Sequence, residues 1–286
     1  MPDAIDPIIN KYNLPPWVKL YAVKYIKKNP MKVISKAFGF VNYGRKKGAL
    51  LSGKVILPNK YEFDIDTVAY ISELFLYGNK KLAEIAIAWS NRQADPYKDH
   101  YARLAEAYEG DARAINSLLD GLKRKPRFEP TKELNEFFEW LRGIDGVYTR
   151  IIALDFIIKY AYAKTFGAVF FKAFYPVSPE FMRQLKSVLN YNSEEFSFGE
   201  AEAMRLIKEK VIPEAELVDF ANKILKLICK SIESEMPIAK EAGISTEISL
   251  LGEVSIAYPL HVIADAGVNI SPDEEAKKIF SECGWK

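Results

Sequence analysis

Two stretches of this chain repeat one plan, and the repeat constrains the fold more than any other feature of the sequence. Each stretch reads as a long helix, a short connection and a second helix that has a proline close to its start, Pro96 in the first stretch and Pro179 in the second. Proline suits the first helical position, and Asp95 and Ser178 before the prolines are good N-caps. The repeat predicts two helical hairpins, with helices at about 66–92, 95–121 and 145–175 and a fourth that begins at Ser178.

Acidic residues stand at matching places in the two predicted hairpins. Glu73 and Asp155 lie in the first helices, and Asp111 and Glu194 lie in the second helices. Two antiparallel helices with a short connection place residues at equal distances from the turn beside each other. If the two hairpins stack, the four carboxylates meet near the centre of a four-helix bundle.

This arrangement resembles the ferritin-like superfamily of di-iron carboxylate proteins. In that family each hairpin supplies one acid from its first helix and a Glu-x-x-His motif from its second. Here Ala114 follows Asp111 at the histidine position and Ser197 follows Glu194, so both motif histidines are absent. The resemblance covers residues 66–205 and implies a ferritin-like bundle without a standard di-iron centre. It implies candidate metal ligands, in a site that is either vacant or holds Mn or Fe ions, at Glu73, Asp111, Asp155 and Glu194.

Asp155 has the most constrained surroundings of the four acids. It lies between the apolar runs "IIAL" and "FII", so we expect it to be buried. A buried carboxylate must be paired, protonated or bound to metal. Lys159 and Arg150 are the nearby cations that could pair with it. Without imidazole, an oxygen-only ligand set favours Mn²⁺ or Mg²⁺ over iron.

Few other residues suggest catalysis. The sequence contains none of the common phosphate-binding, dinucleotide-binding, serine-hydrolase or HExxH patterns. Its two histidines, His100 and His261, are expected to be packed or surface residues. Cys229 and Cys283 are its two cysteines, and they belong to no CxxC motif. We therefore expect neither a disulfide framework nor a zinc site, in keeping with a reducing, cytoplasmic setting.

The remainder of the chain extends an all-α fold at both ends. We expect a basic N-terminal segment at 1–60, the bundle at 61–205 and a C-terminal helical extension at 206–286. A small hairpin is predicted near residues 50–65, where β-branched runs flank a Pro-Asn turn. Further helices are expected at 213–235 and 244–265 and from Ser271, which could form a capping box with Glu274.

Charge is distributed unevenly along the chain. Residues 1–60 hold 12 Lys or Arg and 2 Asp or Glu, although the whole chain has a net charge of only +2. Aromatic residues occur among these cations, which is typical of nucleic-acid or anionic-surface binding but also of a solvated basic face. The apolar segment 151–174 carries Asp155 and three lysines, so we expect no membrane span.

Three functions remain open at this stage. The first is a scaffold or binding protein that kept the bundle and lost the metal, acting as a homo-oligomer or with a protein partner. The second is a metal-dependent oxidoreductase with a carboxylate-only Mn or Fe site. The third is a module that binds nucleic acid or an anionic surface through residues 1–60. Elemental analysis for Fe, Mn and Zn separates the first two.

Overall fold

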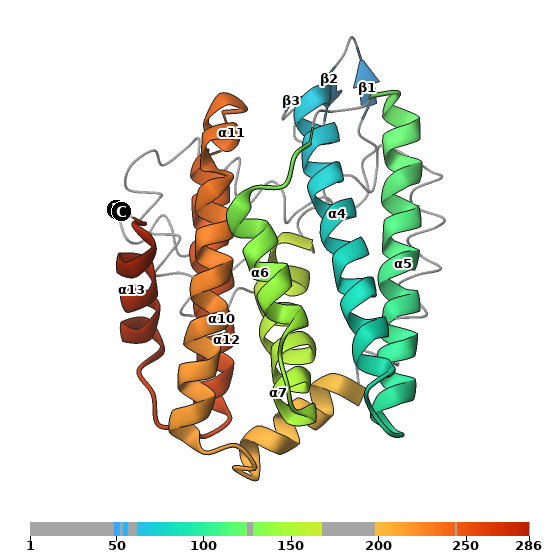
Figure 1. Ribbon diagram of the computed structural model, residues 1–286. Coiled ribbons are helices and arrows are strands. Elements are labelled where there is room, and N and C mark those ends of the chain that lie inside the picture. The colour runs from blue at the N-terminus through green and yellow to red at the C-terminus, as the bar shows by residue number, and fades with distance from the viewer. Residues whose placement is uncertain are drawn as a thin grey trace.

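The computed structural model describes residues 49–51, 54–56, 62–124, 128–167, 198–243 and 245–285, and over these residues the chain is an all-α protein with one small sheet. The described elements are β1 Ala49–Leu51, β2 Lys54–Ile56, β3 Glu62–Asp64, α4 Ile65–Ser90, α5 Tyr97–Leu122, α6 Lys132–Arg142, α7 Val147–Ile151, the π-helix η3 Ile152–Gly167, a helix over 198–208, α10 Glu214–Ser234, α11 Met236–Glu241, α12 Ser245–Asp265 and α13 Pro272–Cys283. The long helices run side by side, and the helix over 198–208 crosses one end of them (Figure 1).

The first predicted hairpin is present as α4 and α5, which pack against each other along their lengths. Asp64 caps α4, because its carboxylate accepts a hydrogen bond of 2.8 Å from the backbone N–H of Asp66. The predicted start of α5 needs correction. Asp95 is not its cap and Pro96 is not its first residue. Pro96 is itself the N-cap residue, because its carbonyl accepts the first helical hydrogen bond, from the N–H of His100.

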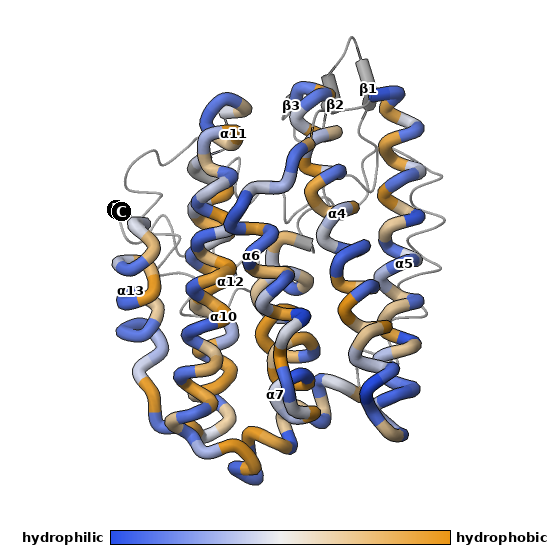
Figure 2. The backbone as a smooth tube through the Cα atoms, in the orientation of Figure 1, coloured by the Kyte–Doolittle hydropathy of each residue, from blue (hydrophilic) through white to orange (hydrophobic). Residues whose placement is uncertain are grey.

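Most of the apolar core lies away from this hairpin. One cluster of buried side chains begins at the C-terminal half of α4 and the N-terminal half of α5. It continues through α6 and η3 to α10, α12 and α13. A second, smaller cluster joins the N-terminal half of α4 and the C-terminal half of α5 to α11. Hydrophobic and hydrophilic residues alternate along the long helices (Figure 2), as expected for helices with one buried face. The larger cluster crosses residue 206 without a break, so helices on both sides of this predicted boundary share it.

The predicted helix at 145–175 is helical as far as it is described, but its winding differs from the expected one. Five residues of α7 lead into η3, in which each N–H bonds to a carbonyl five residues earlier. All residues from Ile151 to Ala161 are buried. A segment that is apolar on every side has no amphipathic stripe, so its sequence pattern does not distinguish the two windings.

The small hairpin predicted near residues 50–65 is present within a three-stranded antiparallel sheet of order β1-β2-β3. In its register Val55 pairs with Leu50 on one side and with Phe63 on the other. β3 leads directly into α4 at Ile65, so the sheet lies at the end of the first hairpin (Figure 1).

Two details of the C-terminal helices bear on the predictions. Ser271 precedes α13 as expected, but its side chain makes no capping hydrogen bond, so the predicted capping box is wrong. The window Ile248–Asp265 in α12 is long and apolar enough to span a membrane, but half of it is buried inside the protein. α12 packs against η3, α10, α11 and α13, as the core helix of a bundle does.

The described helices do not by themselves form the predicted four-helix bundle. α4 packs on α5 and α6, whereas η3 packs on α12, α10 and α7. The fourth helix, predicted from Ser178, falls on residues 168–197, which lie outside the described part of the chain. The ferritin-like arrangement of four helices therefore stays a prediction.

Candidate functional site

The four acids predicted as metal ligands have different surroundings. Asp155, on η3, is only 1% exposed, which confirms its predicted burial. Glu73 on α4 and Asp111 on α5 are half-buried. Glu194 lies outside the described residues. No hydrogen bond or ion pair links any two of the three described acids.

Asp155 is hydrogen-bonded to a histidine from another helix. The Nε2 atom of His100, on the first turn of α5, lies 2.9 Å from Oδ1 of Asp155, and His100 is 4% exposed. Burial of the pair away from water makes this hydrogen bond costly to lose. Two buried atoms of the pair, Nδ1 of His100 and Oδ2 of Asp155, have no hydrogen-bond partner within the described structure.

The helix over 198–208 covers this pair. A β-carbon built on Gly199 would lie 2.1 Å from Oδ1 and 2.3 Å from Cγ of Asp155, so only glycine fits this position. The ring of Phe198 lies 5.1 Å from the imidazole of His100, centroid to centroid. Tyr97 of α5 donates a hydrogen bond of 2.7 Å to Glu202 of the covering helix. We call this meeting of α5, η3 and the helix over 198–208 the three-helix junction.

The predicted partners of Asp155 are wrong. The guanidinium of Arg150 bonds to the carbonyl of Ile144 at 3.0 Å and to Asp145 at 3.3 Å. The ammonium of Lys159 bonds to Glu200 at 2.6 Å. Both cations are close to Asp155 in sequence, but tertiary packing gives each of them a different acceptor, and His100 reaches Asp155 from another helix.

Glu200 is the centre of a second polar group at the three-helix junction. Its carboxylate accepts hydrogen bonds from Lys159, from Lys164 at 2.7 Å and from the hydroxyl of Tyr160. Burial alone would raise the pKa of Glu200, but these hydrogen bonds outweigh it and lower the pKa to about 2. Burial also lowers the pKa of Lys159, against the opposing effect of Glu200. The group ties η3 to the covering helix by charge-assisted bonds.

Asp111 lies in a different electrostatic setting. Desolvation raises the pKa of its carboxyl group to about 7. Ala114, at the position where the resemblance implies a histidine, is fully buried in the smaller apolar cluster with Ile115 and Leu118. The surroundings of this part of α5 therefore favour the uncharged form of the acid in the metal-free protein.

The tyrosines on either side of Glu73 turn towards other helices. The hydroxyl of Tyr70 donates a hydrogen bond of 2.8 Å to Glu235, and that of Tyr77 bonds to the side-chain oxygen of Asn135. Burial comes first among the causes that raise the pKa of Tyr70. Both rings pack against Phe128, so they serve to attach α4 to the segments beside it.

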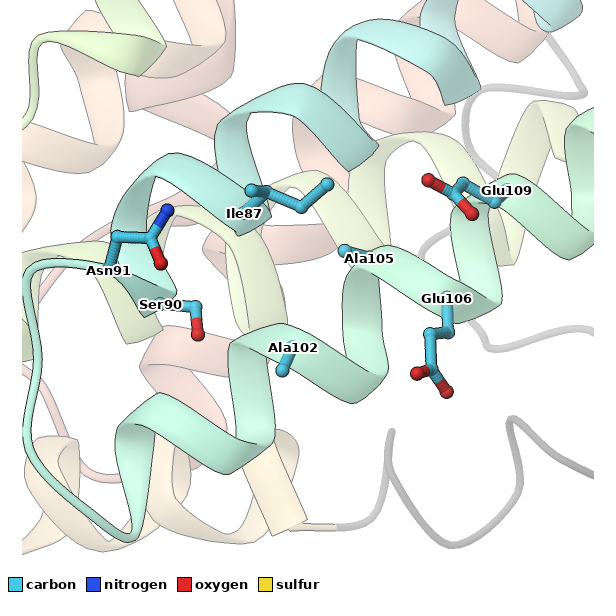
Figure 3. Close-up of a pocket in the computed structure, with 7 residues that line it drawn as sticks. All are labelled: Ile87, Ser90, Asn91, Ala102, Ala105, Glu106 and Glu109. Atoms are coloured by element: carbon cyan, nitrogen blue, oxygen red, sulfur yellow. The ribbon is translucent and has the colours of Figure 1, made fainter.

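A hollow of about 270 Å³ lies where α4 and α5 pack against each other (Figure 3). It is lined by Ile87, Ser90, Asn91, Ala102, Ala105, Glu106 and Glu109. Neither His100 nor Asp155 lines it, so this hollow gives no access to the three-helix junction. The one hydroxyl that lines it, that of Ser90, donates a hydrogen bond of 2.9 Å to the backbone carbonyl of Lys98.

The described residues do not fit the metal centre that the resemblance implies. Over the described ranges, no group of three or more His, Cys, Asp or Glu side chains is arranged to hold a metal ion. Oδ1 of Asp155 is already hydrogen-bonded to the imidazole of His100 and is covered by Gly199. A di-iron centre needs carboxylates that bridge two ions about 4 Å apart. The packing around Oδ1 of Asp155 leaves no room for such an ion at that oxygen.

One signal in the sequence could have located His100. On α5 the buried positions 100, 101, 104, 105, 107 and 108 recur at helical spacing, so the amphipathic pattern places His100 on the inner face. No comparable signal identifies Gly199, because a close approach between two helices leaves no mark in either helix alone. Comparison with known proteins adds no assignment: no family model, curated protein or solved structure matches the chain.

Proposed function

We propose that this chain is a divergent ferritin-like helical protein that acts as a scaffold or binding protein rather than as a metal-dependent enzyme. The observation that carries the proposal is the closure of Asp155 by His100 and Gly199. A bundle without a metal still has to satisfy a carboxylate in its core, and the imidazole of His100 supplies a hydrogen bond there.

The distribution of polar groups at the three-helix junction supports this proposal. Glu200 accepts hydrogen bonds from Lys159, Lys164 and Tyr160, so its carboxylate links η3 to the covering helix. Catalytic acids and bases instead need a substrate within hydrogen-bond reach. The described hollow does not reach this part of the molecule. These contacts between helices are suited to making a rigid helical body that presents its surface to a partner.

Elemental analysis tests the proposal directly. We expect the protein, purified from cells grown with added iron and manganese and then desalted, to hold far less than one Fe, Mn or Zn per chain. His100→Ala and Asp155→Asn should have the same metal content as the parent and differ from it in stability alone. Stoichiometric metal in the parent that is lost in both variants would overturn the proposal and favour the metal-dependent oxidoreductase.

The binding half of the proposal needs its own measurement. Light scattering during size-exclusion chromatography, over a hundredfold range of protein concentration, should show a mass above that of one chain if the partner is a second copy. A monomer at every concentration directs the search to a different protein partner. Binding of single-stranded RNA or DNA that weakens steeply with salt would instead favour the basic segment at residues 1–60 as the functional part.

A further inference from the structure

The two cysteines of this chain lie far apart in sequence and meet in the fold. Cys229 is on α10 and Cys283 is the last residue of α13, and these two helices pack against each other. Cys229 is fully buried, whereas Cys283 is partly exposed. Both cysteines are free thiols in the structure. Cys229 is therefore shielded from solvent, whereas solvent reaches part of Cys283.

The fold brings the two thiols into one neighbourhood. Cys229 belongs to the larger buried cluster, and Cys283 packs against that cluster from α13. The thiol of Cys283 also lies 3.6 Å from the backbone carbonyl of Lys226, one turn before Cys229 on α10. The two contacts hold the accessible sulfur against α10 beside the buried one. Such proximity is the geometric requirement for a disulfide between two helices.

The charges around Cys283 favour its reactive form. Its hydrogen bond with Cys229 lowers the pKa of Cys283, and the ammonium groups of Lys230 and Lys226 act in the same direction. Burial and the carboxylate of Glu282 oppose this effect, and Glu282 is itself paired with Lys226. The hydrogen bond and burial instead raise the pKa of Cys229. The pair thus consists of an accessible thiol that loses its proton more readily than an ordinary thiol and a buried one that loses it less readily.

We propose that Cys283 and Cys229 form a hydroperoxide-reactive site, with Cys283 as the attacking thiol and Cys229 as the resolving thiol. A thiolate that is exposed and has a second thiol beside it is the arrangement that peroxide-sensing cysteines use. The proposal is independent of the scaffold function, because it concerns α10 and α13 and not the three-helix junction.

The reaction proceeds in two balanced steps. The Cys283 thiolate attacks one oxygen of the hydroperoxide, an S–O bond forms, the O–O bond breaks, and the leaving oxygen takes a proton to become an alcohol or water. Sulfur is oxidised to a sulfenic acid and the peroxide is reduced. Cys229 then loses its proton and attacks the Cys283 sulfur. An S–S bond forms, the S–O bond breaks, and hydroxide leaves with that proton as water.

The test uses the full chain, reduced and then freed of reductant. One equivalent of hydrogen peroxide should make the intact protein about 2 Da lighter without joining two chains, and dithiothreitol should reverse the change. Free thiols, counted after denaturation, should fall from two per chain to none. A product about 32 Da heavier, with no loss of mass before it, would overturn the proposal, as would disulfides that form only between chains.

Single variants assign the two roles. Cys229→Ser should stop at the sulfenic acid, about 16 Da heavier and trapped by dimedone. Cys283→Ser leaves only the buried thiol and should react at least about tenfold more slowly than Cys229→Ser. Equal rates in the two variants would overturn the assigned roles. Because a core serine could disturb folding, both variants are compared with the parent by circular dichroism, and Cys229→Ala replaces Cys229→Ser if helicity is lost.

Discussion

Gly199 lies so close to Asp155 that a β-carbon at Gly199 would be 2.1 Å from the carboxylate oxygen Oδ1. The backbone of the helix over 198–208 thus occupies the space next to a buried carboxylate on η3. The same oxygen is hydrogen-bonded to the imidazole of His100 on α5. A single carboxylate therefore contacts two other helices, and the consequences of these contacts can be measured.

Gly199→Ala should destabilise the protein strongly. The added methyl group would overlap Asp155, and forcing atoms into a packed core costs about 1–3 kcal/mol or more. Gly78→Ala is the matched control, because its β-carbon would meet nothing closer than Phe138 at 3.8 Å. Alanine there should be neutral or stabilise α4 by up to about 1 kcal/mol. The free energy of unfolding in urea checks both. Equal stability of the two variants would mean that Gly199 does not pack on Asp155.

Asp155→Leu should be poorly tolerated, because its removal leaves the buried imidazole of His100 without a partner. Leaving a buried hydrogen-bonding group without its partner costs about 1–3 kcal/mol, whereas replacing both partners by apolar residues is often nearly neutral. The double variant His100→Leu/Asp155→Leu should therefore be more stable than Asp155→Leu alone.

A double-mutant cycle distinguishes His100 from Lys159 as the partner of Asp155. The coupling energy between His100 and Asp155 should exceed about 1 kcal/mol, and that between Lys159 and Asp155 should be smaller. Lys159 should couple instead to Glu200, its partner at 2.6 Å. A larger coupling for Lys159 with Asp155 would restore the pairing that the sequence suggested.

Asp111→Asn should change how stability depends on pH. The folded state raises the pKa of Asp111 from 3.8 to about 7, so it favours the protonated acid. The parent is therefore fully stable, as far as this group is concerned, below about pH 4, and it loses stability as the pH rises towards 7.

Asparagine cannot ionise, so Asp111→Asn should be more stable than the parent at pH 8 by about 2–4 kcal/mol and nearly equal to it at pH 4. Urea unfolding at the two pH values measures the difference. The exposed Asp120 of the same helix provides the control, since Asp120→Asn should have little effect at either pH. A difference between Asp111→Asn and the parent that is the same at pH 4 and pH 8 would contradict the assigned desolvation.

Glu200→Gln should have the opposite pH dependence. The folded state lowers the pKa of Glu200 from 4.5 to about 2, so its ion pairs stabilise the protein above about pH 4.5 and are lost as the pH falls towards 2. Because its side chain is 27% exposed, we expect a cost of only about 1–2 kcal/mol for Glu200→Gln at pH 7.

The cost of Glu200→Gln should disappear near pH 2, where the parent has also lost the charge. Acid unfolding followed by circular dichroism measures this convergence. Glu209→Gln, which removes an exposed partner of Arg205 just after the same helix, should cost less at pH 7. If Glu209→Gln were the more damaging change, Glu200 would not be the centre of the junction's ion pairs.

Much of the local structure could be predicted from the sequence. The α4–α5 hairpin and a strand hairpin within the small sheet follow from apolar periodicity, caps and turn residues, all of which act over a few neighbouring positions. Thr131, for example, caps α6 by accepting a hydrogen bond of 3.3 Å from the N–H of Leu134. The burial of Asp155 was also predictable, because apolar residues surround it in every direction along the helix.

The partners within the site could not be predicted in the same way. Lys159 and Arg150 were the expected partners of Asp155 because they are near it in sequence, yet both have acceptors of their own. A hydrogen bond between side chains depends on where distant helices cross, and a pattern within one helix does not contain that information.

The sequence by itself determined that this chain is helical and that one carboxylate lies in its core, because periodicity and burial are properties of single segments. Only the tertiary structure decided that His100 meets Asp155, that Gly199 closes over it and that Cys283 of α13 packs beside the α10 turn that carries Cys229. Each of these contacts joins segments from different helices. Their formation depends on the free energy of packing the whole core, which no short stretch of sequence specifies.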